Sequence, residues 1–186
     1  MPKIVVSHPY DGAGQRIRRL GLQSLLDEIY GILTGFELRV LEQKDANGGA
    51  AIRKMIDREF EKAGDWAKTT VGDVDWVKCK YINGTAVCIG VEIQFSARSD
   101  LIIRDLVHLR DAINLGEIDL GILVLPTDLL SYYATDRGPS ISAGMRVVRE
   151  MKVDELPLLL IAIEHDGPGP ALAKQEKKQK KNPTES

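Results

Sequence analysis

Apolar and polar residues along the chain follow two different periods, which together predict a mixed α/β domain. Apolar residues at every third or fourth position predict helices. The predicted helices lie between the turn at 11–14 and Gly35, and at residues 50–63, 99–115 and 142–151. Alternating or continuous apolar runs of strand length predict strands. The predicted strands are residues 3–7, 36–41, 74–80, 85–95, 118–125 and 156–163.

The centre of the chain carries the strongest short-range signal. Asn83-Gly84 separates the segments 74–80 and 85–95, and this dipeptide is a preferred two-residue hairpin turn. We therefore expect an antiparallel pair of strands there. The almost continuous apolar run at 118–125 instead suggests a strand that is covered on both faces, and 3–7 is also expected to be buried. The sequence thus predicts a central mixed sheet with helices on both faces.

The composition favours one folded domain. A chain of 186 residues that is 44% hydrophobic has enough apolar surface for one core and too little for two. We expect residues 1–166 to form this domain, because Gly-Pro-Gly-Pro and a lysine-rich stretch follow; residues 167–186 are expected to be a disordered tail. The formal net charge of -2 argues against a general polycation that coats nucleic acid. The sequence contains neither a membrane-length apolar run nor a signal peptide, so we expect a cytoplasmic protein.

Cysteines and histidines give little evidence of chemistry at this stage. Cys79 and Cys88 flank the predicted turn, and a lone pair does not establish an oxidising compartment. Reduced, packed thiols are the expectation, and a disulfide across the hairpin is the alternative. The histidines, His8, His108 and His165, have no metal-site spacing, so structural or surface roles are expected. Neither a Walker loop nor a complete dinucleotide-binding glycine motif occurs, and no nucleotide cofactor is indicated.

Acidic and amide residues gather on the predicted hairpin. Asp75 lies on its first strand and Glu92 on its second, so folding back at the turn brings them level. Glu92 and Gln94 project from one face because side chains alternate along a strand, while Ile93 points the other way. Carboxylates are ligands that Mg²⁺ prefers, and hydrolysis of a phosphodiester needs such a cation to activate water and to neutralise charge. A plain hairpin with a solvated polar face is the competing interpretation.

This arrangement resembles the PD-(D/E)xK signature of nucleases, and the flanking sequence narrows the likeness. Val-Glu-Ile-Gln-Phe-Ser at 91–96 resembles the glutamate-x-glutamine-Phe core of the BglII and BstYI group of type II restriction endonucleases, in which glutamine replaces the usual lysine. Gly-Asp-Trp-Ala-Lys at 64–68 resembles the segment before their first catalytic strand. Residues 118–126 and 156–163 resemble two further strands of the group. The likeness covers most of residues 3–164 in order.

The resemblance implies a restriction-endonuclease-like α/β fold and a role for each residue of the hairpin. Asp75 would bridge the metal, Glu92 would be the second ligand, and the backbone carbonyl of Ile93 would be a further ligand. Gln94 would orient the attacking water or an oxygen of the scissile phosphate. Asp73 is an alternative to Asp75. The other residues that stay open as members of the site are Thr69 and Glu28.

Two segments are candidates for reading DNA, which requires side chains that reach the bases and the phosphates. One follows the second hairpin strand, and the other lies where the family carries a serine-rich recognition loop. The candidate DNA-binding residues are Ser96, Arg98, Ser99, Tyr133, Arg137, Ser140 and Ser142. An ordinary loop in which Ser142 caps the next helix is the alternative for the second segment. Ala97 and Arg98 depart from the family pattern, so the recognition sequence does not follow from it.

The sequence therefore predicts a Mg²⁺-dependent type II restriction endonuclease that hydrolyses double-stranded DNA. Cutting both strands of a symmetric site needs two active sites related by a twofold axis, so we expect a homodimer, with the helix at 99–115 or the first helix at its interface. The resemblance implies a short palindrome with a GATC-like centre, cut to leave a 5′ overhang. The rival interpretations are a repair or nicking nuclease of the same fold, and a non-catalytic DNA-binding protein with a degenerate nuclease fold.

Overall fold

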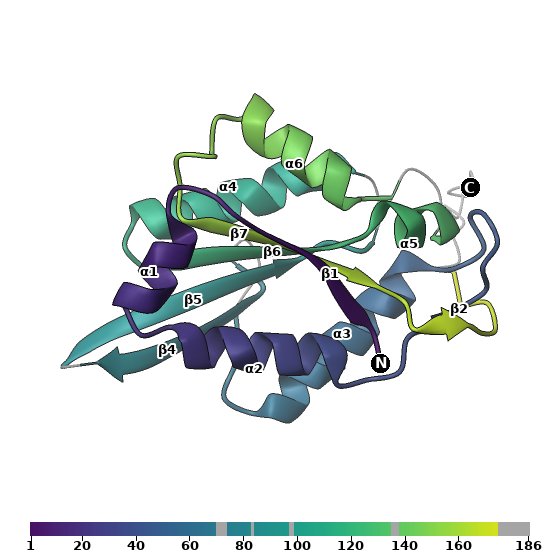
Figure 1. Ribbon diagram of the computed structural model, residues 1–186, viewed down its shortest axis with the longest axis horizontal. Coiled ribbons are helices and arrows are strands. Elements are labelled where there is room, and N and C mark those ends of the chain that lie inside the picture. The colour runs from purple at the N-terminus through teal and green to yellow at the C-terminus, as the bar shows by residue number, and fades with distance from the viewer. Residues whose placement is uncertain (70–73, 83, 97–98, 135–137, 175–186) are drawn as a thin grey trace, which may run out of the picture.

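A six-stranded mixed sheet forms the centre of the protein, whose computed structural model describes residues 1–69, 74–82, 84–96, 99–134 and 138–174. The strand order is β1-β7-β6-β5-β4-β3 (Figure 1). The strands are β1 (Lys3–Pro9), β3 (Ala67–Lys68), β4 (Trp76–Ile82), β5 (Thr85–Ile93), β6 (Leu120–Pro126) and β7 (Leu158–Glu164). β5, β6 and β7 run parallel, whereas β1, β4 and β3 pair antiparallel with their neighbours. The expected mixed sheet is confirmed.

Helices cover both faces of this sheet. They are α1 (Ala13–Arg19), α2 (Gln23–Thr34), α3 (Gly49–Ala63), α4 (Leu101–Asn114), α5 (Asp128–Tyr133) and α6 (Ile141–Glu150). Figure 1 shows α2 and α3 on one side of the sheet and α4 and α6 on the other. Each pair closes its own apolar cluster against the sheet, and β6 contributes Val124 to one cluster and Leu125 to the other. The expected two-sided burial of this strand is confirmed.

The hairpin of β4 and β5 has the register that the sequence predicts. Trp76 lies opposite Val91, and Cys79 lies opposite Cys88. Val91 packs in the cluster of α2 and α3 and Cys88 in that of α4 and α6, so Glu92 faces α4 by alternation. A disulfide joins Cys79 to Cys88. The expectation of reduced thiols is wrong here, because direct pairing across the strands brings the two sulfurs together.

The N-terminal half departs from prediction in two places. The first predicted helix is two helices, because the backbone at Gly21 turns into the left-handed region with φ +64°. Both helices bury apolar residues in the same cluster, which preserves the periodicity across the break. The predicted strand at 36–41 contracts to β2 (Arg39–Val40), which forms a separate two-stranded sheet with β8 (Gly167–Pro168).

The edges of the fold show three further differences. β1 is an edge strand with alternating exposure, not a buried strand, because it pairs with β7 alone. The first residues of the expected loop at 131–140 belong to α5, whose start is capped by Thr127. In the segment assigned to the tail, the backbone N–H of Leu172 donates to Asn47 Oδ1 at 3.1 Å. Ordered contacts thus continue beyond residue 166; residues 175–186 lie outside the described residues.

Across the described part of the chain, no helix is both long enough and apolar enough to cross a bilayer.

Candidate active site

Asp75 and Glu92 meet where the hairpin of β4 and β5 ends. Asp75 directly precedes β4, and Glu92 is the last residue but one of β5. The register that pairs Trp76 with Val91 makes the two acids level, and their side chains are hydrogen-bonded. Asp75 Oδ2 also accepts a hydrogen bond from the backbone N–H of Ile93 at 2.9 Å. The structure thus brings together the two acids and the backbone segment that the sequence analysis selected.

The pKa values of the two carboxyl groups are shifted in opposite directions. The side chain of Glu92 is 3% exposed, and burial together with the adjacent Asp75 raises the pKa of Glu92 to about 11. Burial alone would also raise the pKa of Asp75. The hydrogen bond from Glu92 and the guanidinium of Arg53 outweigh burial, so the pKa of Asp75 is lowered. Adjacent buried carboxylates repel unless a proton or a cation lies with them, so this pair is suited to a divalent cation.

Arg53, on α3, reaches the same strand ends. Its Nη2 donates to Asp75 Oδ1 at 2.9 Å, and its Nη1 donates to the carbonyl oxygen of Ile93. Its Nε donates to Asp57 Oδ2 at 2.9 Å. Asp57 is itself fixed by the indole N–H of Trp76 at 3.0 Å. The guanidinium therefore contacts two of the three groups that were expected to bind a metal.

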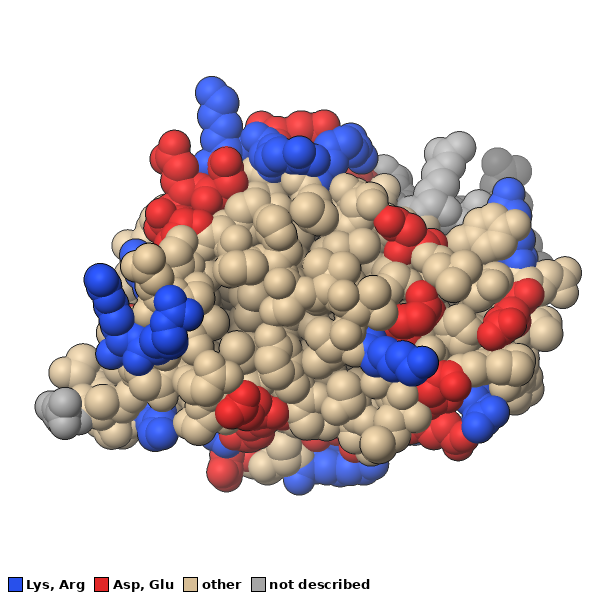
Figure 2. Space-filling model, in the orientation of Figure 1, with Lys and Arg blue, Asp and Glu red and all other residues tan. Residues whose placement is uncertain are grey.

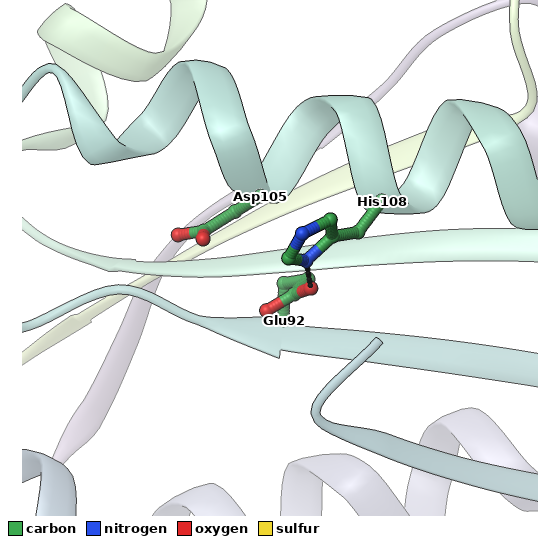
Figure 3. A group of neighbouring side chains, drawn as sticks. All are labelled: Glu92, Asp105 and His108. Atoms are coloured by element: carbon green, nitrogen blue, oxygen red, sulfur yellow. Dashed lines mark hydrogen bonds and ion pairs between the residues drawn. The ribbon is translucent and has the colours of Figure 1, made fainter. Parts of the chain in front are cut away.

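Helix α4 supplies the other side of the site. Gln94 Nε2 donates to Asp105 Oδ2 at 2.7 Å, and both side chains are buried. His108 Nδ1 lies 2.9 Å from Glu92 Oε1. Figure 3 shows Asp105 and His108 projecting from α4 toward Glu92 on β5. One ligand atom from each of Glu92, Asp105 and His108 lies within 4.8 Å of the others, so this group could also hold a metal ion.

Glu28 lies on the opposite face of the sheet from this site. It accepts hydrogen bonds from Trp66 Nε1 and from Lys78 Nζ, both at 2.8 Å. Lys78 is two residues from Trp76, which packs in the cluster of α2 and α3, so both point to that face. Glu92 points to the other face. Glu28 therefore binds Trp66 and Lys78, away from Asp75 and Glu92.

Thr69 lies beside the site. Among the described residues, no hydrogen bond joins it to Glu92. Its hydroxyl donates to the carbonyl of Val74, and its backbone N–H donates to the carbonyl of Asp75 at 3.4 Å. Thr69 and His108 both line a cavity of about 430 Å³ between β4 and α4. Asp73, the alternative to Asp75, lies outside the described residues.

The described candidate DNA-reading residues after β5, Ser96 and Ser99, lie between β5 and α4. Ser96 and Ser99 are half-buried. The carbonyl of Ser99 accepts a hydrogen bond from the backbone N–H of Ile102 at 3.2 Å and so joins the first turn of α4. Arg98 lies outside the described residues, as does Arg137 of the second segment. Ser96 follows Gln94 by two residues along the chain.

The second candidate segment is organised by α5 and α6. Ser140, not Ser142, caps α6, since its hydroxyl accepts from the backbone N–H of Ala143 at 3.3 Å. The alternative in which Ser142 caps this helix is wrong, because its exposed hydroxyl donates to Asp128 instead. Tyr133 packs edge-on against the ring of His165, with centroids 5.5 Å apart.

Basic side chains form separate groups on the face that Figure 2 displays. Figure 2 shows Lys and Arg in separate groups near α1 and near α6, with acidic and uncharged surface between them. Arg16, Arg18 and Arg19 are the basic residues of α1. This distribution agrees with the formal net charge of -2, which gives no wide cationic coat.

Sequence reasoning missed Arg53 and Asp105 and gave His108 no role in a site. Asp105 carried a readable signal, because it falls on the buried side of α4 between Ile102 and Leu109, and a buried acid needs a partner. The sequence gives no comparable signal for Arg53 or His108. Their contacts come from the way α3 and α4 pack on the sheet, which periodicity alone does not specify.

A mixed sheet with two acids and an amide at the end of one antiparallel pair is the architecture of a restriction-endonuclease-like nuclease. Comparison with protein families agrees: the model for restriction endonuclease BglII/BglIII matches residues 8–163. The match spans most of the 186 residues, and the chain belongs to this restriction endonuclease family. No curated protein sequence matches the chain. The resemblance and the fold expected from the sequence are confirmed. Membership of this family identifies the protein as a nuclease that acts on DNA.

Proposed function

We propose that the protein is a type II restriction endonuclease that hydrolyses phosphodiester bonds of double-stranded DNA in a Mg²⁺-dependent reaction. The family match supports the nuclease class. The contact between Asp75 and Glu92 carries the assignment of the site, because a half-buried acid and a buried acid are held together at the ends of neighbouring strands. Such a pair is costly in a fold unless it binds a proton or a cation.

The donor atoms around this contact suit Mg²⁺. The carboxylates of Asp75 and Glu92 and the carbonyl of Ile93 are hard oxygen ligands, which this ion prefers. The guanidinium of Arg53 already contacts Asp75 and that carbonyl. This contact supports the view that these oxygens attract a positive charge. The alternative group with Asp105 and His108 includes an imidazole, which suits transition metals better. We therefore assign Mg²⁺ to the oxygen donors.

Bound there, Mg²⁺ would activate a water molecule and offset the charge that develops on the phosphate. Gln94 would orient the attacking water or a phosphate oxygen, since a neutral amide cannot act as a base. Asp105 accepts from the amide nitrogen of Gln94 and would hold this amide in position for that role. Asp105 is a positioning residue in this proposal.

DNA contacts and dimer formation complete the proposal. Recognition would use Ser96, Arg98 and Ser99 after β5, together with the segment that contains Tyr133, Arg137, Ser140 and Ser142. A palindromic target with a GATC-like centre, cut to a 5′ overhang, would require a homodimer. Helix α4 exposes Ile103 by 46%, and Leu115 directly after it by 74%, which supports this helix as the interface. An enzyme of this function would act in the cytoplasm, where it meets DNA.

Digestion of mixed-sequence plasmid DNA with Mg²⁺, followed by sequencing of the fragment ends, tests the function. The proposal predicts discrete fragments that share a palindromic sequence and 5′ overhangs, and no cleavage after chelation of the metal. DNA binding without cleavage would favour a non-catalytic binding protein. Nicks in one strand by a protein with the mass of a monomer would favour a repair or nicking nuclease.

A further inference from the structure

Among the described residues, Arg53 makes three polar contacts, which lie within the proposed metal site or directly beside it. Two of its donors bind Asp75 Oδ1 and the carbonyl oxygen of Ile93, and the third binds Asp57. The other oxygen of Asp75 accepts from the backbone N–H of Ile93. Both oxygens of Asp75 are therefore already engaged.

A divalent cation that binds these oxygens is brought close to the positive charge of the guanidinium. Mg²⁺ binds oxygen at about 2.1 Å and Ca²⁺ at about 2.4 Å. An ion at that distance from Asp75 Oδ1 would lie close to the guanidinium nitrogen that is 2.9 Å from the same atom. Two positive charges at such short range repel strongly where water is largely excluded.

Asp57 gives the guanidinium a partner that does not belong to the metal site. It lies one turn along α3 from Arg53 and is anchored by the indole N–H of Trp76. Arg53 can therefore release Asp75 and the carbonyl of Ile93 while its Nε keeps the bond to Asp57. The arginine would leave the oxygens of the metal site and keep the counter-charge of Asp57.

We propose that Arg53 competes with the divalent cation for Asp75 and the carbonyl of Ile93, and so lowers the affinity of the DNA-free protein for metal. This inference rests on the proposed function, because it takes those oxygens as the metal ligands. In this proposal Arg53 is a positioning residue that holds Asp75 and the carbonyl of Ile93 in place until a cation displaces the guanidinium.

Calorimetric titration of the DNA-free protein with CaCl₂ tests the competition. Arg53→Gln is compared with Arg58→Gln, which removes the same charge from an exposed position on the same helix. Loss of the competitor should tighten Ca²⁺ binding by about tenfold in Arg53→Gln, within the usual range for coupled binding, and leave Arg58→Gln near wild type. Equal affinities in the two variants, or weaker binding by Arg53→Gln, would overturn the proposal.

Two controls test whether the variants fold and whether Ca²⁺ binds at Asp75. Thermal unfolding of each variant is measured with and without Ca²⁺, and Arg53→Lys replaces Arg53→Gln if the latter does not fold. Lysine cannot bridge Asp75, Ile93 and Asp57 together, so Arg53→Lys should also bind Ca²⁺ more tightly than wild type. Adding Asp75→Asn to either variant should abolish the gain. Failure of folded wild type and variants alike to bind Ca²⁺ would instead contradict the proposed metal site itself.

Discussion

The amide nitrogen of Gln94 lies 2.7 Å from Oδ2 of Asp105 in the buried layer between β5 and α4. Removing the acceptor would leave a buried donor unsatisfied, which costs about 1–3 kcal/mol. Asp105→Ala should therefore lower the free energy of unfolding by about this amount and slow DNA cleavage. Asp105→Asn keeps an acceptor and should retain more of both properties.

Urea unfolding and initial cleavage rates measure these effects. Asp111→Ala is the matched control, because this acid lies on the same helix with its side chain 54% exposed. If Asp105→Ala cleaved DNA as fast as Asp111→Ala, Asp105 would have no part in positioning Gln94.

His165 should make stability depend on pH. Its ring contacts the carboxylates of Glu164 and Glu42. Burial by itself would lower the pKa of His165, but the two carboxylates outweigh it and raise the pKa above the ordinary 6.5. Its charged form therefore stabilises the fold. The contribution is complete below the unfolded pKa and is lost as pH rises through the folded pKa.

The free energy of unfolding of wild type and His165→Gln is compared at about pH 5.5 and about pH 9. Wild type should exceed the variant by more at the lower pH. A difference that stays constant, or grows with pH, would show that the histidine is not charged in the folded protein.

Gly49 allows α3 to pack directly on the segment that follows β5. A Cβ at this position would lie 1.9 Å from the carbonyl oxygen of Phe95, so the backbones would have to separate. Gly49→Ala should cost at least about 1–3 kcal/mol of stability. Gly31→Ala is the control, because nothing lies within 4 Å of a Cβ there and the residue is inside α2.

Gly31→Ala should instead stabilise the protein by about 0.5–1 kcal/mol, since alanine favours a helix interior. Chemical denaturation of both variants provides the measurement. Equal stability of Gly49→Ala and wild type would mean that α3 does not approach Phe95 this closely.

The disulfide between Cys79 and Cys88 should stabilise the hairpin without being needed for the fold. Closing a loop of this size contributes about 2–3 kcal/mol, and the backbone pairing of β4 with β5 should persist without the disulfide. A reducing agent should lower the stability of wild type by about that amount. The double variant Cys79→Ser, Cys88→Ser should be insensitive to reduction, and two titratable thiols in the untreated protein would contradict the bond.

Prediction from sequence succeeded where local signals and burial agree. The turn after Ile82 and the alternation along β5 determine which acids are level, and the register of Trp76 with Val91 agrees with both. The apolar run that became β6 has no polar residue on either face, so its central position could also be predicted. These elements depend mostly on nearby residues.

The remainder depends on packing between distant segments. The break at Gly21 was hidden because the helices on either side bury the same kind of residue in one cluster. β2 is short because its partner is β8, which lies in a segment whose composition predicted a tail. Arg53 and His108 reach the site only after α3 and α4 pack on the sheet, so sequence spacing could not place them.

The central claim is that the pair of Asp75 and Glu92 forms the cation-dependent cleavage centre. Initial rates of Mg²⁺-dependent cleavage are measured for Asp75→Asn beside Asp27→Asn, which changes an exposed acid of α2 in the same way. Asp75→Asn should lose about a hundredfold or more in rate while it still binds DNA, because metal ligation supplies several kcal/mol of transition-state stabilisation. Asp27→Asn should match wild type. Cleavage by folded Asp75→Asn at the wild-type rate would contradict the account.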